Sequence, residues 1–210
     1  PAIWELAENT LKEVLDSTGK DYNINPGDGA FYGPKIDFHL KDAIGRNWQC
    51  GTIQLDFQMP DKFNLTYEGA DNQKMRPVML HRVIYGSVER FMGILVENFE
   101  GKFPLWLSPV QVIVLPIADR HNDYASFVSK KLKEAGLRVE VDDAALTMNK
   151  KIRNAELSKI NYILVVGDAE EKNQTINVRT RDNEILGEIK VSEFIKQLNE
   201  EITEKRITRK

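Results

Sequence analysis

A pair of prolines, Pro104 and Pro109, divides the chain into two stretches with different residue patterns. Two prolines this close together prevent a regular helix or strand from running through the segment. After Pro109, apolar runs of strand length alternate with segments whose apolar residues recur at helical spacing. Such alternation is typical of a parallel sheet covered by helices. The sequence therefore predicts two domains, over residues 1–107 and 108–210.

The second stretch is predicted to form an α/β domain with a mixed sheet. Its first strand, over residues 110–116, is apolar except for Gln111, as expected of a strand that is covered on both faces. Further strands are predicted over residues 137–141, 162–166, 175–180 and 185–189, and helices over residues 124–132, 148–160 and 194–202. The last two strands are expected to add a hairpin to the parallel strands, which makes the sheet mixed.

The first stretch is predicted to be an α+β domain, mostly antiparallel strand with two helices. Apolar residues at helical spacing predict one helix over residues 3–15, stopped at Gly19, and another from near Gly86 to Phe99. Strands are predicted over residues 22–24, 36–40, 48–57, 65–67 and 77–80. His81 thus stands at the end of a strand, with a turn between it and the second helix.

Composition restricts the classes of function. Apolar residues make up 41% of the chain and charged residues 29%, and no apolar run is long enough to span a bilayer. A single cysteine excludes an internal disulfide, which favours a reducing compartment such as the cytoplasm. The net charge of -3 argues against general affinity for nucleic acid but leaves local basic patches as RNA contacts. Basic residues gather at Lys150, Lys151 and Arg153, at Arg179 and Arg181, and at Lys205, Arg206, Arg209 and Lys210.

The segment from His81 to Phe91 places binding chemistry on a strand-to-helix turn. Gly86 has no Cβ, so a flat ligand can approach the backbone closely there. Arg90 is expected in the first turn of the helix, where free amide groups favour an anion. Its planar guanidinium can stack on a base or hold a phosphate. His81, judged alone, is more often a structural histidine than a ligand.

Two other segments carry polar residues that need an explanation. The glycines between Gly27 and Gly33 do not form a dinucleotide-binding fingerprint, because their spacing is wrong and a strand follows them. Gln49 and Gln54 lie among apolar neighbours, where a buried amide is costly unless it forms hydrogen bonds. Cys50 is interpreted as a small core residue without a chemical role.

Residues 77–91 resemble motif 3 of the class II aminoacyl-tRNA synthetases, in the form found in the threonyl-tRNA synthetases. Residues 27–37 and 48–57 resemble the strands of the ATP and threonine sites of that family, and residues 149–153 and 178–181 resemble its anticodon-binding domain. The resemblance covers nearly the whole chain in the expected order. It implies part of a class II catalytic domain, built on an antiparallel sheet, followed by an α/β anticodon-binding domain.

The resemblance also implies roles for individual residues. Lys35 and Arg90 match catalytic positions, and the adenylate contacts match Gln49, Thr52, Gly86 and Arg90. Threonine contacts match Tyr32 and Gln54, and anticodon contacts match Glu170 and Arg179. His81 matches the last of three Zn²⁺ ligands, and in the family this zinc binds the amino group and hydroxyl of threonine. Residues 144–149 depart from the common bacterial pattern, which leaves the contact usually made at Ala145 without support.

The activity that the resemblance implies is a threonine–tRNA ligase reaction. ATP, with Mg²⁺ bridging its phosphates, activates threonine to threonyl-adenylate, and threonine is then transferred to the 3′ end of tRNA(Thr). The whole enzyme is expected to be a cytoplasmic homodimer with no membrane contact. Motif 1, motif 2 and the other two zinc ligands are not recognisable in this sequence. The chain is therefore expected to be a C-terminal fragment that is inactive by itself.

Two other interpretations remain open. One is another synthetase of the same subclass, such as the prolyl enzyme, against which His81 beside the strand over residues 48–57 favours threonine. The other is a non-catalytic tRNA-binding module derived from a synthetase. Lys35 and Arg90 count against this module, because a protein that no longer binds ATP has no need of them.

Overall fold

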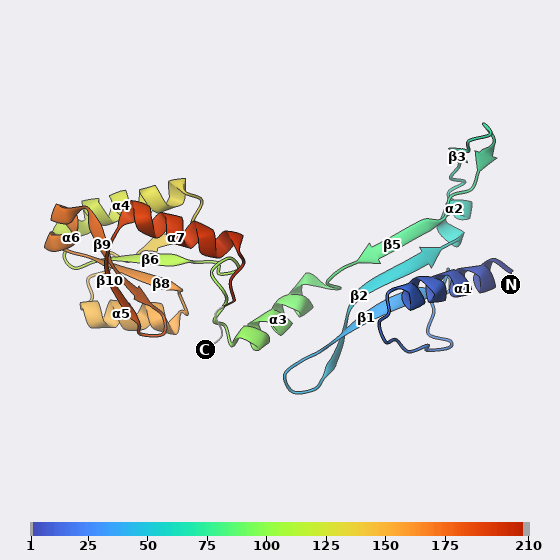
Figure 1. Cartoon of the computed structure of the whole chain (residues 1–210), viewed down its shortest axis with the longest axis horizontal. Coiled ribbons are helices and arrows are strands. Elements are labelled where there is room, and N and C mark those ends of the chain that lie inside the picture. The colour runs from blue at the N-terminus through green and yellow to red at the C-terminus, as the bar shows by residue number, and fades with distance from the viewer. Residues whose placement is uncertain (1, 208–210) are drawn as a thin grey trace. The chain divides into compact units, whose positions relative to one another are not determined.

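The computed structural model describes residues 2–207, and its backbone forms two compact units, Pro1–Asn98 and Phe99–Lys210 (Figure 1). This division precedes the domain boundary expected at residues 107/108, which stays a prediction. No helix in residues 2–207 is both long enough and apolar enough to cross a membrane. The two units are described separately below.

The first unit is an antiparallel sheet with helices, which confirms the predicted α+β class. Its three-stranded sheet has the order β1-β2-β5 and is formed by β1 (Lys35–Lys41), β2 (Asn47–Asp56) and β5 (Met79–Val83). The helices are α1 (Ala2–Ser17), α2 (Gln58–Lys62) and α3 (Val88–Phe99), and a small ribbon pairs β3 (Tyr67–Glu68) with β4 (Lys74–Met75). The site residues expected in the first domain lie mainly on this sheet.

Several predicted boundaries in this unit are wrong. Residues 22–24 form no strand and lie in a segment without regular structure that follows α1. β5 continues to Val83, so His81 lies inside a strand and not at its end. By contrast, α3 begins at Val88, two residues after Gly86 and near the predicted start, where the Ser87 hydroxyl caps the helix by accepting the Arg90 backbone N–H at 3.1 Å.

The hairpin between β1 and β2 is fixed by one carboxylate. Asp42 accepts hydrogen bonds from the Trp48 indole at 2.8 Å and from the Arg46 backbone at 2.8 Å. Burial acts to raise the Asp42 pKa, but these hydrogen bonds outweigh burial and lower the pKa to about 2. Arg46 also donates to Glu97 of α3 at 2.7 Å, so the hairpin and α3 are held together.

The first unit has little core of its own. Among its described residues, Ala7 and Cys50 are the hydrophobic residues that are buried, and α3 buries none. Large apolar side chains are exposed on the sheet and α3, among them Phe38, Leu40, Leu80, Val83, Val88 and Met92. Since apolar burial is the main stabilising term in folding, this unit is expected to be less stable than the second.

The second unit is a five-stranded mixed sheet, as predicted. The strands are β6 (Val112–Pro116), β7 (Val139–Val141), β8 (Tyr162–Val166), β9 (Thr175–Thr180) and β10 (Ile185–Lys190), in the order β10-β9-β8-β6-β7. β6 is parallel to β7 and β8, and β9 runs antiparallel to β8 and β10. The helical elements are η1 (Asp119–His121), α4 (Asn122–Glu134), α5 (Met148–Leu157), α6 (Asp168–Asn173) and α7 (Val191–Thr203).

Two hydrophobic clusters cover the two faces of this sheet. α4 and α7 lie on one face, where Val128 and Phe194 pack against Val114, and α5 lies on the other, where Ala155 packs against Ile113 (Figure 1). Neighbouring residues of β6 thus enter opposite clusters, which explains why the whole strand is apolar.

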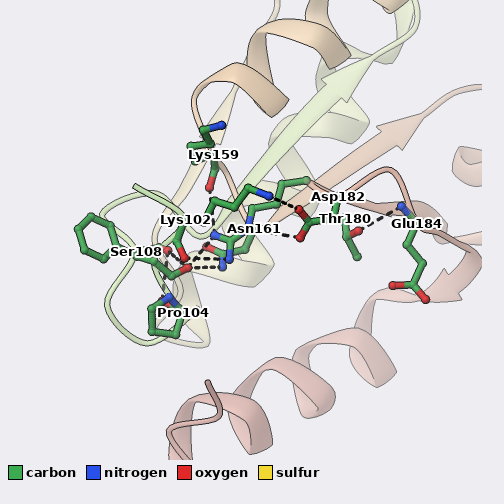
Figure 2. A network of polar contacts seen from close by, with 10 residues as sticks. Lys102, Pro104, Ser108, Lys159, Asn161, Thr180, Asp182 and Glu184 are labelled. Carbon is green, nitrogen blue, oxygen red and sulfur yellow. Dashed lines mark hydrogen bonds and ion pairs between the residues drawn. The ribbon is translucent and has the colours of Figure 1, made fainter. Parts of the chain in front are cut away.

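The segment before β6 is bound to the second unit through its backbone carbonyls. Arg181 donates to the carbonyls of Phe103 at 2.7 Å and Lys102 at 3.1 Å, and Asn161 also donates to Phe103 at 3.0 Å. Figure 2 shows Lys102 and Asn161 in this network, together with Asp182, which accepts from the Lys102 side chain at 2.8 Å. Leu105 has no exposed surface and belongs to the hydrophobic cluster beneath α4 and α7, called the α4–α7 cluster below.

These contacts predict where an independently folding segment begins. A segment starting at Lys102 should unfold cooperatively and be about 3 kcal/mol more stable than one starting at Val110, which lacks Leu105 and the bound carbonyls. Urea unfolding of the two segments, followed by circular dichroism, measures the difference. Equal midpoints would show that the segment before β6 adds nothing to the fold.

Candidate functional site

Strand register aligns three of the predicted site residues in one row across the first sheet. Lys35 of β1 pairs with Gln54 of β2, and Gln54 pairs in turn with His81 of β5. Paired residues on neighbouring strands point to the same face, so the three side chains lie side by side. The next row on this face contains Asp37 and Thr52. The antiparallel sheet therefore gathers residues that are far apart in the sequence.

A bulge in β2 brings Gln49 to the same face. Phe38 pairs with Gly51 and His39 pairs with Gln49, so Cys50 is an extra residue with no partner on β1. Strict alternation from Gln54 would place Gln49 on the opposite face, but one extra residue reverses the alternation. The bulge therefore aligns Gln49 with Thr52 and Gln54. Cys50 itself is buried, and the structure gives it this local backbone role.

Lys35 is held by carboxylates at the edge of this face. Its ammonium lies 2.7 Å from Asp37 and 3.6 Å from Asp28. The hydrogen bond to Asp37 raises the pKa of Lys35, so this side chain carries its positive charge. Burial acts to raise the Asp37 pKa, but the bond from Lys35, its charge and the neighbouring Thr52 and Gln49 side chains together outweigh burial and lower the pKa.

Asp37 was not among the residues that the sequence predicted for the site. Its two-residue spacing from Lys35 was the available signal. One oxygen of its carboxylate and the Thr52 hydroxyl are buried without a hydrogen-bond partner in the described part of the chain. The Thr52 hydroxyl is near enough to help lower the Asp37 pKa but does not reach hydrogen-bonding geometry. The two atoms, one acceptor and one hydroxyl, therefore keep hydrogen-bonding capacity that the described residues do not use.

The segment before β1 places Tyr32 over the same row. The Tyr32 hydroxyl donates to the Gln54 side chain at 2.5 Å, and its ring lies 5.8 Å from that of His81. This position requires Gly33, because a Cβ there would lie 2.0 Å from the Leu55 carbonyl oxygen. Tyr32, Gln54 and His81 thus form one contiguous cluster.

His81 is oriented by a buried carboxylate. Its Nε2 lies 2.9 Å from one oxygen of Asp56, while the other oxygen accepts the backbone N–H groups of Gln58 and Met59 at the start of α2. Burial acts to raise the Asp56 pKa, but the backbone hydrogen bond from Met59 and the contact with His81 lower it. Because an ionised carboxylate only accepts, Nε2 carries the proton and Nδ1 offers its lone pair.

This arrangement suits a metal ligand, since ligating histidines commonly hold a carboxylate on their other nitrogen. His81 could therefore contribute Nδ1 to a zinc ion. No three His, Cys, Asp or Glu side chains within residues 2–207 lie close enough together to hold a metal ion. The described residues thus fit one ligand of such a site and do not complete it.

Arg90 is brought to the bulge by the turn before α3. Gly86 has a φ of +71°, and a Cβ at this position would lie 2.8 Å from the carbonyl oxygen of Cys50. This contact explains the glycine, which lets the turn approach the bulge closely. Arg90 is exposed and donates to the carbonyl of Gln49 at 3.3 Å. The guanidinium and the Gln49 backbone are therefore neighbours at one end of the polar face.

The residues expected to contact RNA lie on different elements of the second unit. Glu170 belongs to α6, a helix that was not among those predicted from the sequence, and one of its oxygens accepts the Gly167 backbone N–H at 3.0 Å. Arg179 of β9 pairs with Ile163 of β8 and therefore points to the face of the sheet that carries α5. Its Cα lies four residues from the start of β9, about 13 Å along the strand.

Two residues of the basic patches are structural. Lys151 is buried and donates to the backbone carbonyls of Asp142 at 2.9 Å and Pro116 at 3.4 Å. Arg181 binds the segment before β6, as described above. Neither side chain is available as an RNA contact. Of the C-terminal patch, Lys205 lies over the Trp106 ring and Arg206 pairs with Glu204, whereas Arg209 and Lys210 lie outside the described residues.

Comparisons with known proteins match both units. A model of the tRNA synthetase class II core domain (G, H, P, S and T) covers residues 3–99, and a model of an anticodon binding domain covers residues 111–201. A threonine–tRNA ligase of Carboxydothermus hydrogenoformans is 58% identical over 204 residues, which are 97% of this chain and 32% of the relative. The chain thus spans about a third of the length of the curated relatives it matches.

Solved structures give the same assignment. The RNA binding domain of threonyl-tRNA synthetase from Cryptosporidium parvum matches with a TM-score of 0.86 and 45% identity over 95% of this chain and 50% of that chain. A prolyl-tRNA synthetase of Cryptosporidium parvum, solved with L-proline and AMP, matches with a TM-score of 0.64 and 24% identity over 85% of this chain and 39% of that chain. This second likeness shows a shared fold alone. From the two family models in this order and relatives of this identity, we conclude that the chain belongs to the threonyl-tRNA synthetase family of the class II aminoacyl-tRNA synthetases.

Proposed function

We propose that this chain is part of a threonine–tRNA ligase, which activates threonine with ATP and transfers it to the 3′ end of tRNA(Thr). The single observation that carries this proposal is the row formed by Lys35, Gln54 and His81 on one face of the first sheet. This face combines a fixed positive charge, amide groups and an imidazole with a free nitrogen. A cytoplasmic homodimer is part of the proposal.

The polar face suits the binding of an aminoacyl-adenylate. Lys35 would neutralise phosphate or carboxylate charge, and the exposed Arg90 would stack on the adenine or bind a phosphate. Gln49 and Thr52 would bond the adenylate, over which the turn at Gly86 allows close approach. In this proposal the protein acts by positioning and electrostatics, and Mg²⁺ would supply further charge neutralisation on the ATP phosphates.

The amino-acid end of the site would be formed by Tyr32, Gln54 and His81, which are in mutual contact. A zinc ion held partly by His81 would supply a Lewis acid for the threonine amino group and hydroxyl. Asp56 would keep Nδ1 of His81 free for this ion. A site that binds a hydroxyl group rejects an isostere without it, which supports threonine over valine. The prolyl alternative has no such use for His81.

The second unit would bind the anticodon of the tRNA. Glu170 can accept a hydrogen bond from a base amino group, and the Arg179 guanidinium can stack on a base or donate to its edge. The single-stranded anticodon exposes its bases for both kinds of contact. A non-catalytic tRNA-binding module would also use this unit, but it gives no reason for the polar face around Lys35.

A chimera tests this function directly. Replacing the matching 204 residues of the Carboxydothermus hydrogenoformans ligase by this chain should give an enzyme that charges tRNA with threonine and not with proline. Changing Lys35→Ala in the chimera should lower kcat/KM about 100-fold or more, because a positioned charge is lost from the transition state. Aminoacylation with radiolabelled threonine, proline and valine provides the measurement.

The controls separate the ligase from the module. The chain alone is expected to show no threonine-dependent pyrophosphate exchange and to retain no stoichiometric zinc, since a single histidine is too weak a chelator. Turnover by the chain alone would contradict this expectation. A folded chimera that binds tRNA without charging it would instead favour the non-catalytic module.

A further inference from the structure

The helix that carries Glu170 cannot hold its position by itself. α6 has 6 residues, and an isolated helix of this length is unstable in water. Glu170 uses one carboxylate oxygen to cap its own helix through Gly167, so its remaining oxygen is directed by the placement of α6. The orientation of this carboxylate therefore depends on contacts between α6 and the rest of the unit.

Side chains from η1 and the first turn of α4 provide these contacts, from the first residue of α6 to the start of β9. Arg120 forms a bidentate ion pair with Asp168, the first residue of α6, through hydrogen bonds of 2.7 and 3.1 Å. Tyr124 donates to the Thr175 carbonyl at 2.8 Å, just beyond the last residue of α6. Between them, His121 Nδ1 lies 3.1 Å from the Glu171 carboxylate.

His121 is the best placed of these side chains to fix α6. Arg120 and Asp168 are exposed, so their ion pair contributes little, whereas His121 is only 1% exposed. The ring can therefore not move aside, and its Nδ1 presents a rigid donor to Glu171. Its Nε2 is also buried, 3.5 Å from Asp168, without a hydrogen-bond partner in the described part of the chain. Glu171 is the neighbour of Glu170 on the same short helix.

We propose that His121 is a positioning residue for anticodon recognition: it holds α6 through Glu171 where Glu170 can reach an anticodon base. This role rests on the proposed function of the second unit. His121 does not touch RNA in this scheme. Instead, it restricts the motion of the Glu170 carboxylate, which contacts the base. Less conformational entropy is then lost when the base contact forms.

Paired variants isolate the hydrogen bond from the charge. Glu171→Ala and Glu171→Gln remove the same charge, but only glutamine keeps an acceptor for His121 Nδ1. Glu171 is half exposed, so both variants should fold. His121→Ala removes the donor, and His121→Asn replaces it with an amide N–H at the position of Nδ1.

Two measurements on the full chain test the proposal. Amide hydrogen exchange in residues 168–173 should quicken about tenfold in Glu171→Ala and His121→Ala and remain near wild type in Glu171→Gln and His121→Asn. The ratio of Kd values for an anticodon-swapped and a cognate threonine tRNA transcript, at fixed salt, should fall about tenfold in the two alanine variants. Binding to the swapped transcript should not change, because phosphate contacts are unaffected.

The outcomes distinguish this role from the function on which it rests. Wild-type protein that does not discriminate between the two transcripts would overturn anticodon reading itself, and the role of His121 with it. If wild type discriminates between the transcripts and Glu171→Ala retains the same ratio of Kd values, the role of His121 alone would be overturned. Exchange in α6 that is equal in Glu171→Ala and Glu171→Gln would also overturn it, independently of RNA.

Discussion

Replacing Arg181 by alanine is expected to destabilise the second unit by about 3 kcal/mol, because the buried guanidinium and its hydrogen bonds to several backbone carbonyls are lost together. Arg181 donates to Phe103 at 2.7 Å, Lys102 at 3.1 Å and Lys159 at 3.4 Å. Burial lowers the pKa of its guanidinium, as expected for a cation surrounded largely by protein. Urea unfolding of the full chain, read at the transition of the second unit, measures the loss.

Arg179 provides a matched control for this measurement. It lies two residues before Arg181, on β9, which ends at Thr180, and no hydrogen bond or ion pair holds it in the described part of the chain. Arg179→Ala should therefore change stability by less than about 0.5 kcal/mol. Arg181→Lys should retain part of the stability, because one ammonium cannot reach all three carbonyls with the geometry of a guanidinium. Equal midpoints for the two alanine variants would show that the segment before β6 is held by other contacts.

The fold of the second unit could be predicted because its sequence pattern has one physical explanation. β6 is apolar at every position, since its side chains enter the α4–α7 cluster and the α5 cluster alternately. Such a strand is found inside a sheet covered on both faces. The first unit was predicted less well, because its exposed apolar residues, such as Leu80 and Met92, carry little information about which segments are strands.

The polar face of the first unit could be predicted by residue but not by arrangement. Alternation from Gln54 reaches Thr52 but then places Gln49 on the wrong face. The bulge at Cys50 restores Gln49 to the polar face, and the turn at Gly86, which is distant in the sequence, packs closely against this bulge. Asp37 lies in the segment that resembles the family, but no role was assigned to it, although it alternates with its partner Lys35 on one strand.

The basic residues show why sequence could not separate RNA contacts from structural ones. Lys151 and Arg181 look like members of basic patches, but both donate to backbone carbonyls. Every residue has a backbone carbonyl, so the sequence does not indicate which carbonyls accept a hydrogen bond from a basic side chain. α6 was missed for a different reason: 6 residues are too few to show a helical period.

Arg179→Ala is expected to weaken the binding of threonine tRNA by about 1–3 kcal/mol, the usual effect of losing a base contact or stacking interaction. Arg179 is half exposed and points to the α5 face of the sheet, and within residues 2–207 no side chain occupies its guanidinium. Fluorescence anisotropy at fixed salt would compare wild type and variant on a cognate transcript and on one with a swapped anticodon. The loss should be confined to the cognate transcript.

Salt dependence distinguishes this contact from a purely electrostatic one. If Lys205 binds a phosphate, Lys205→Ala should weaken all RNAs alike and lower the slope of log K against log salt by about 1. Arg179→Ala should instead reduce specificity and change that slope less. Equal losses on both transcripts would identify Arg179 as a backbone contact. The reading of the anticodon would then have to rest on Glu170 and on the position of α6, because the α5 face of the sheet would contribute charge without sequence information.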